Sequence, residues 1–96
     1  MDYEFHPHAE QEYYEAIDYF AAIDSDLAEA FIREIESAII IICDRPEMYP
    51  RVSSNVQRCL VRTFPYGVLY QADERILIVA VMQLNRRPGY WKDRVN

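Results

Sequence analysis

The chain has 96 residues, 51% of them hydrophobic and 14% aromatic. It therefore fits one compact domain with a single core, and is too short for two domains and too apolar for intrinsic disorder. Residues 1–48 contain thirteen acids and two arginines, a net charge of −11, whereas residues 49–96 contain eight basic residues and three acids, a net charge of +5. We expect the C-terminal half to present a basic surface to an anionic partner, unless the two halves neutralise each other within the fold. No run of about 18 apolar residues and no signal peptide is evident, so we expect a cytoplasmic protein that does not cross a membrane.

The N-terminal half predicts a short strand followed by two helices. Residues 3–5 form a β-rich run, expected to join a sheet at its edge. Apolar residues at three- and four-residue spacing predict a helix over 8–23, and the acids of 24–26 are suited to cap a second helix. That helix should end at 44–46, because the residue before a proline disfavours helical backbone, and the isoleucines of 39–42 predict burial nearly all round at this end. The short link makes the pair an antiparallel hairpin.

The C-terminal half predicts a β-meander after a loop at residues 47–56, in which 51–52 form a brief extended piece. The expected strands are 58–64, 68–72 and 75–84, and the expected turns between them are 65–67 and 73–74. Connections of two or three residues allow only antiparallel hairpins. Because residues 76–82 are apolar at every position, we expect this strand to be central and covered on both faces. Phe31 and Ile78 should be fully buried in the core.

Arginines mark a candidate binding surface. Alternation along the first predicted strand puts Arg58, Arg62 and Phe64 on one face, expected to be the face turned away from the helices. There Arg58 and Arg62 would stand about 13 Å apart, at about 3.3 Å per residue, beside the segment that carries Arg86 and Arg87. Several guanidinium groups on one face can bind phosphates or an acidic peptide. The alternative is that each arginine forms an ordinary surface ion pair.

The segment after the last predicted strand adds two aromatic residues. A Pro-Gly turn presents Tyr90 and Trp91, which suit stacking on bases or anchoring a partner, although Trp91 is equally suited to close the core. The pair His6 and His8 is the one candidate for metal binding, and it lacks a third ligand at suitable spacing, so no metal or cofactor is expected.

Other familiar chemistry is not encoded. The chain has two glycines and therefore no glycine-rich phosphate loop, it has no G-x-S-x-G motif, and its basic half contains no histidine to activate a nucleophile. Cys43 and Cys59 lack a C-x-x-C spacing and are expected to be buried, reduced thiols.

These residues carry a family resemblance. Arg58, residues 64–70, the apolar run 76–81, residues 86–91 and Arg94 together resemble the C-terminal signature of the RelE/ParE superfamily, the toxins of type II toxin–antitoxin modules. The helical hairpin also resembles that family, so the similarity covers nearly the whole chain as a single toxin domain, residues 1–96. The resemblance implies an α+β fold, with an N-terminal strand and an α-helical hairpin packed on a small antiparallel β-sheet, in agreement with the periodicity.

Members of this superfamily have two different functions. RelE-like members are ribosome-dependent mRNA endoribonucleases, whereas ParE-like members inhibit DNA gyrase. The turn at 64–66 and the tail at 86–91 resemble the ParE branch more. This implies growth inhibition, plasmid stabilisation, and gyrase and a cognate antitoxin as partners, with a toxin–antitoxin hetero-oligomer as a possible assembly. In the RelE-like alternative the targets are the ribosome and mRNA.

The residues themselves weigh against a nuclease. Attack by a ribose 2′-hydroxyl needs a base, an acid and cations at the phosphate, and the available set is Arg62, Arg86 and Tyr90. Arginine stays protonated and is a poor base, and many relatives have a histidine near the position of Gln83. We therefore favour a non-enzymatic gyrase inhibitor, with the nuclease as the alternative and a non-toxic β-edge interaction module third. The expected target- or antitoxin-binding residues are Arg58, Arg62, Arg86, Arg87, Tyr90 and Trp91.

Overall fold

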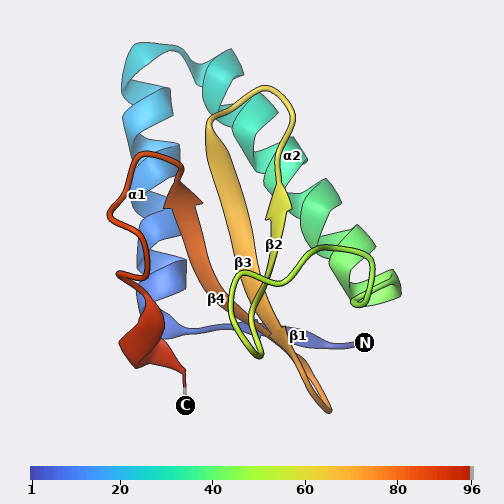
Figure 1. Cartoon of the computed structure of the whole chain (residues 1–96). Coiled ribbons are helices and arrows are strands. Elements are labelled where there is room, and N and C mark those ends of the chain that lie inside the picture. The colour runs from blue at the N-terminus through green and yellow to red at the C-terminus, as the bar shows by residue number, and fades with distance from the viewer. Residues whose placement is uncertain (96) are drawn as a thin grey trace.

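The computed structural model describes residues 1–95, in which two helices pack on one face of a four-stranded sheet (Figure 1). The elements in chain order are β1 (Tyr3–Phe5), α1 (Pro7–Ile23), α2 (Ser25–Asp44), β2 (Gln57–Leu60), β3 (Tyr66–Ala72), β4 (Ile76–Gln83) and the 3₁₀ helix η1 (Lys92–Arg94). The predicted α+β fold, a strand and a helical hairpin packed on a small sheet, is confirmed.

The ends of both helices follow from local chemistry. The imidazole Nδ1 of His6 accepts a hydrogen bond from the N–H of His8 (3.1 Å) and caps α1, and Pro7 occupies the first turn, where its missing N–H has no cost. Asp24 alone separates the helices, and its carboxylate caps α2 by accepting from the N–H of Asp26 (2.9 Å). Both helices therefore begin and end within one or two residues of their predicted bounds.

The sheet has the order β1-β4-β3-β2. β2, β3 and β4 form the predicted antiparallel meander, while β1 pairs with β4 in parallel, so the whole sheet is mixed. A β-bulge interrupts the β3–β4 pairing, because Leu69 lies opposite Ala80 and Tyr70 lies opposite Ile78, which leaves Val79 as the extra residue. Val79 and Ala80 both belong to the cluster on the face away from the helices. The uninterrupted apolar run of β4 is thus central and covered on both faces, as predicted.

The main core lies between the helices and the sheet. Phe31 on α2 and Ile78 on β4 are both 0% exposed, which confirms their predicted burial. The Phe31 ring lies 5.0 Å from Phe20 and 5.2 Å from Phe64, measured between ring centroids, so aromatic edges and faces fill the space between the helices and the sheet.

The C-terminal end of α2 is buried on one side only. Ile39 and Ile42 are buried, whereas Ile40 is 68% exposed and Ile41 is 41% exposed. The expectation that this end is buried all round is wrong, because a single face of α2 meets the sheet and the four consecutive isoleucines span the whole circumference of the helix.

The first strand of the meander is shorter than predicted. β2 ends at Leu60, so the prediction that this strand continues to residue 64 is wrong. β3 begins at Tyr66, so the prediction that residues 66 and 67 belong to a turn is also wrong. The cause lies on α2, where the Glu34 carboxylate accepts hydrogen bonds from the N–H groups of Arg62 (3.0 Å) and Thr63 (3.1 Å) and from the Thr63 hydroxyl. These bonds draw the chain away from the sheet, and Phe64 then enters the helix-side core.

Both cysteines are free thiols. Cys59 on β2 is buried as expected, and burial raises its pKa. Cys43, in the last turn of α2, is half-buried.

Candidate functional site

The face of the sheet opposite the helices, which we call the open face, is covered in part by the C-terminal tail. Trp91 is 4% exposed and packs with Val56, Leu69, Val79 and Ala80. Of the two roles considered for Trp91, the structure shows the core role. The buried indole ring offers no free face for stacking on a base.

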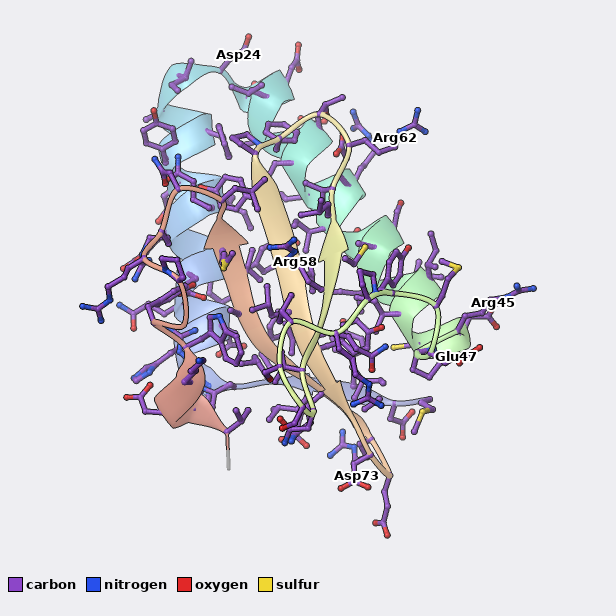
Figure 2. The ribbon with its side chains drawn as sticks, in the orientation of Figure 1. Asp24, Arg45, Glu47, Arg58, Arg62 and Asp73 are labelled. Carbon is purple, nitrogen blue, oxygen red and sulfur yellow. The ribbon has the colours of Figure 1, made fainter. Side chains whose placement is uncertain are left out.

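A groove of about 290 Å³ runs between the tail and the open face; we call it the open-face groove. Its apolar walls include Leu69, Met82 and Leu84. Its cations are Arg58, Arg86 and Lys92, and no acidic side chain lines it. Figure 2 shows Arg58 in front of the sheet, over the strands. The predicted basic open face is therefore confirmed for Arg58 and Arg86, and it includes Lys92, which the sequence reasoning had not selected.

Two of these cations have no ionic partner within the part of the chain that the structure describes. Among residues 1–95, neither Arg58 nor Lys92 forms an ion pair, whereas Arg86 Nη1 lies 3.9 Å from the Glu12 carboxylate. Uncompensated charge beside apolar walls favours an anionic ligand, because the ligand gains ion pairs at a site that is already partly shielded from water.

A buried carboxylate on α1 holds the tail in place. Glu12 Oε1 accepts hydrogen bonds from the N–H of Val81 (3.1 Å) and from Arg94 Nη1 (3.0 Å). Glu12 Oε2 accepts from Arg94 Nη2 (3.0 Å) and from the hydroxyl of Tyr90 (2.6 Å). The Glu12 and Arg94 side chains are 12% and 9% exposed. We call this arrangement the Glu12 clasp.

The clasp occupies a gap in the sheet. β1 pairs with Ile76 to Ile78 of β4 and extends no further. Beyond that point the Glu12 carboxylate accepts a hydrogen bond from the N–H of Val81, and Arg94 Nη1 donates one to the carbonyl of Val79 (3.0 Å). The clasp thus satisfies backbone groups that a longer β1 would have paired, as buried polar groups require.

The clasp also fixes Tyr90 and Arg86. The Arg86 guanidinium lies 3.9 Å from the centroid of the Tyr90 ring, a cation–π contact. Burial raises the pKa of Tyr90 above its usual value, and the hydrogen bond to Glu12 raises it further. Tyr90 is consequently held as a neutral hydrogen-bond donor.

Sequence reasoning missed Glu12. One signal was present, because Glu12 lies three residues after Ala9 and four before Ala16, both buried, so an acid interrupts the apolar stripe of α1. Arg94 entered only as part of the family resemblance, without a role.

Arg62 does not join the open-face groove. It lies beside Glu34 and lines a different hollow, of about 680 Å³, between α2 and the segment that follows β2. Figure 2 shows it next to α2 and away from Arg58. The expectation that Arg58 and Arg62 share one face is wrong because β2 ends at Leu60, before the alternation reaches Arg62. Arg87 is exposed on the tail.

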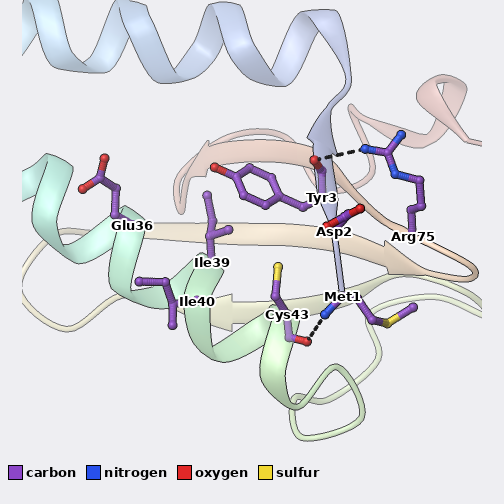
Figure 3. A pocket seen from close by; sticks show the side chains of 8 residues that line it. All are labelled: Met1, Asp2, Tyr3, Glu36, Ile39, Ile40, Cys43 and Arg75. Carbon is purple, nitrogen blue, oxygen red and sulfur yellow. Dashed lines mark hydrogen bonds between the residues drawn. The ribbon is translucent and has the colours of Figure 1, made fainter.

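A further hollow, of about 580 Å³, lies where the N-terminus meets α2, and Figure 3 shows its lining. There the α-amino group of Met1 donates to the carbonyl of Cys43 (2.9 Å), and Arg75 donates to the carbonyl of Tyr3 (3.4 Å). It contains none of the predicted site residues. These contacts seat the N-terminal strand, and we assign no other role to this hollow.

The molecule is thus a small α+β domain that carries an acidic helical hairpin on one face of its sheet and a basic groove, lined by Arg58, Arg86 and Lys92, on the other. Neither helix of residues 1–95 has the length and apolar content needed to cross a bilayer.

Comparison with known families agrees with this description. The model of the family described as the ParE toxin of the type II toxin–antitoxin system, parDE, matches residues 3–88. The chain belongs to this family and is a toxin of the RelE/ParE superfamily, with an antitoxin as its partner. The match includes Glu12, Arg58 and Arg86, and Tyr90 and Arg94 lie beyond it. No curated protein matches the sequence.

Proposed function

We propose that this toxin stops growth by binding DNA gyrase and blocking its activity, and that a cognate antitoxin neutralises it in a hetero-oligomer. It would act in the cytoplasm, where gyrase works on DNA, and the module would contribute to plasmid stabilisation. In this proposal the toxin acts through contact with its target and does not catalyse a reaction.

The state of Tyr90 carries the proposal. A nuclease would need Tyr90 to give up a proton, but its hydroxyl donates to Glu12 at 2.6 Å and its pKa is raised. The carboxylate in contact with Tyr90 is that of Glu12, which is therefore the candidate base. Its oxygens already accept four hydrogen bonds, which is the number of lone-pair positions that a carboxylate has.

The position of Arg62 supports the same conclusion. The three residues considered for RNA cleavage were Arg62, Arg86 and Tyr90. Arg62 lies beside Glu34 next to α2, whereas Arg86 and Tyr90 lie together on the tail. Catalytic groups act on one reacting centre and must converge on it. A binding surface has no such requirement.

Two assays on the purified toxin test the target. We expect inhibition of DNA supercoiling by purified gyrase, and intact mRNA when primer extension is run on translating ribosomes. Arg86→Ala and Arg87→Ala should each weaken inhibition about tenfold or less, because contact residues contribute gradually. Arg45→Ala should change nothing, since that side chain is 69% exposed at the far end of α2.

The opposite pattern would support the RelE-like alternative. Cleaved mRNA with unaffected gyrase, and a loss of about 100-fold or more on removing one residue, would indicate groups that act as a catalytic unit.

A further inference from the structure

We propose that the Glu12 clasp positions the tail, residues 85–95, for contact with the toxin's target. In this role Glu12 and Arg94 are positioning residues. They hold the tail in the conformation that presents Arg86 and Arg87. The inference rests on the proposed function, in which these two arginines contact the target, and it adds two residues that act on the target only through the tail.

The tail is attached to the body of the domain at two points. Its backbone hydrogen bonds, such as those from the N–H of Tyr90 to the carbonyl of Arg87 (3.2 Å) and from the N–H of Arg94 to the carbonyl of Trp91 (2.9 Å), close turns within the tail. They shape it without joining it to the sheet. The attachment comes from Trp91, which packs on the open face, and from the clasp, which joins the tail to α1 (Figure 1).

Of these two attachments, the clasp is the one that reaches the arginines. Glu12 Oε2 accepts a hydrogen bond from the Tyr90 hydroxyl at 2.6 Å. The Tyr90 ring in turn lies 3.9 Å from the Arg86 guanidinium, and the Tyr90 N–H donates to the carbonyl of Arg87. Both arginines are therefore connected to Glu12 through Tyr90.

Burial separates the residues that present the surface from those that form it. The side chains of Glu12 and Arg94 are 12% and 9% exposed, whereas that of Arg86 is 49% exposed and Arg87 is exposed as well. A target meets the arginines and not the clasp. The clasp must then act by preorganisation, because a tail that is already held loses less conformational entropy on binding than a free one.

A clasp that only stabilised the fold would behave differently. When Glu12→Ala is combined with Arg94→Met, no unpaired charge is left buried, so part of the lost stability should return. Neither new side chain can accept the hydrogen bond of Tyr90, so the tail stays released. Stability and inhibition should therefore separate in this double variant, whereas a purely structural role would restore them together.

The first test compares inhibition of gyrase supercoiling with stability in urea, at a temperature where circular dichroism shows every variant to be folded. We expect Glu12→Gln, and Glu12→Ala with Arg94→Met, each to weaken inhibition about tenfold. The control is Ile35→Val or Ile35→Ala, whichever matches the double variant in stability. Ile35 is 0% exposed in the core between the helices and the sheet, so this control should inhibit within about twofold of the wild type.

A second test asks whether the clasp acts through the arginines. In a variant that already contains Arg86→Ala and Arg87→Ala, Glu12→Gln should cause less than about a twofold further loss of inhibition, because the positioned groups are gone. Amide exchange gives a direct readout of the tail. The N–H groups of Tyr90 and Arg94 should exchange faster in Glu12→Gln than in the stability-matched Ile35 variant.

Three results would each overturn the inference. Inhibition could return together with stability in the double variant, the Ile35 control could lose as much inhibition as the clasp variants, or Glu12→Gln could keep its full effect in the absence of both arginines.

Failure of the proposed function would look different. If the wild-type toxin does not inhibit gyrase, the target is wrong, and the same variants are compared by growth arrest on expression without antitoxin. Separation of stability from growth arrest there would support the inference, and its absence would overturn it. If Arg86→Ala and Arg87→Ala both keep full activity, the assigned contact surface is wrong and the inference falls with it.

Discussion

Replacement of Glu12 by alanine should be among the most destabilising single changes in this domain. The substitution removes the acceptor for four hydrogen bonds, which come from Val81, Tyr90 and both terminal nitrogens of Arg94. It leaves the Arg94 side chain, 9% exposed, with the carbonyl of Val79 as its remaining acceptor within residues 1–95. A charged group would then be buried without its counter-ion.

The expected size follows from that burial. Removing one member of a buried, hydrogen-bonded ion pair costs about 3–5 kcal/mol, because the other member keeps its desolvation penalty. A domain of this length has a free energy of unfolding of roughly 5–15 kcal/mol. The Glu12→Ala change should therefore remove at least about a fifth of the total stability.

Urea denaturation with the wild type and three variants checks this value. Asp18→Ala, on an exposed position of the same helix, should cost less than about 0.5 kcal/mol. The double variant Glu12→Ala with Arg94→Met should recover part of the loss, because no unpaired charge remains. A loss below about 1 kcal/mol for Glu12→Ala would refute the reasoning, since water would then be solvating Arg94 and the clasp would not be a buried unit.

Two further predictions concern the core and the segment after β2. Phe31→Ala and Ile78→Ala should each cost about 2–5 kcal/mol in denaturant melts, because both side chains are fully buried, and a loss below about 1 kcal/mol at both sites would mean that the helices do not pack on the sheet as described. Although burial opposes the effect, hydrogen bonds from Thr63 and Arg62 lower the pKa of Glu34, so its contribution to stability is present above the unfolded-state pKa and is lost as the pH falls. Wild-type stability should consequently decline more steeply below about pH 5 than that of Glu34→Gln, and equal slopes would contradict this assignment.

The sequence predicted the features that depend on neighbouring residues. Helix periodicity, the cap at Asp24 and the hairpin order of β2 to β4 are set within a few positions along the chain, and all were found. The end of β2 was not predicted, because it depends on Glu34, which is 28 residues from Arg62 in the sequence. The β-rich composition of this segment does not reveal that the Glu34 carboxylate accepts hydrogen bonds from the N–H groups of Arg62 and Thr63.

In the candidate site, too, some residues could be predicted from the local sequence and others depend on long-range contacts. Arg58 and Arg86 could be selected from charge and from their place on or after a strand, and both line the groove. The Glu12 clasp joins residues 82 positions apart, so no local pattern shows that Arg94 is buried and neutralised. The β-bulge at Val79 likewise arises from the register between two strands.

The net charge of +5 in the C-terminal half overstates the basic surface that a partner meets. Arg94 is enclosed with Glu12, Arg86 lies 3.9 Å from the same carboxylate and Arg75 is paired with Glu4, so acids of the N-terminal half pair with three of those cations. Both alternatives considered for the charge asymmetry are thus found, in different places. The two halves neutralise each other at the Glu12 clasp and at the β1 edge, whereas the open face keeps a basic surface. What remains next to apolar walls is Arg58 and Lys92, each set against a glycine. Recognition should accordingly depend on these two residues more than on the total charge. Substitutions that change net charge equally elsewhere, such as Arg45→Gln, should leave partner affinity almost unchanged.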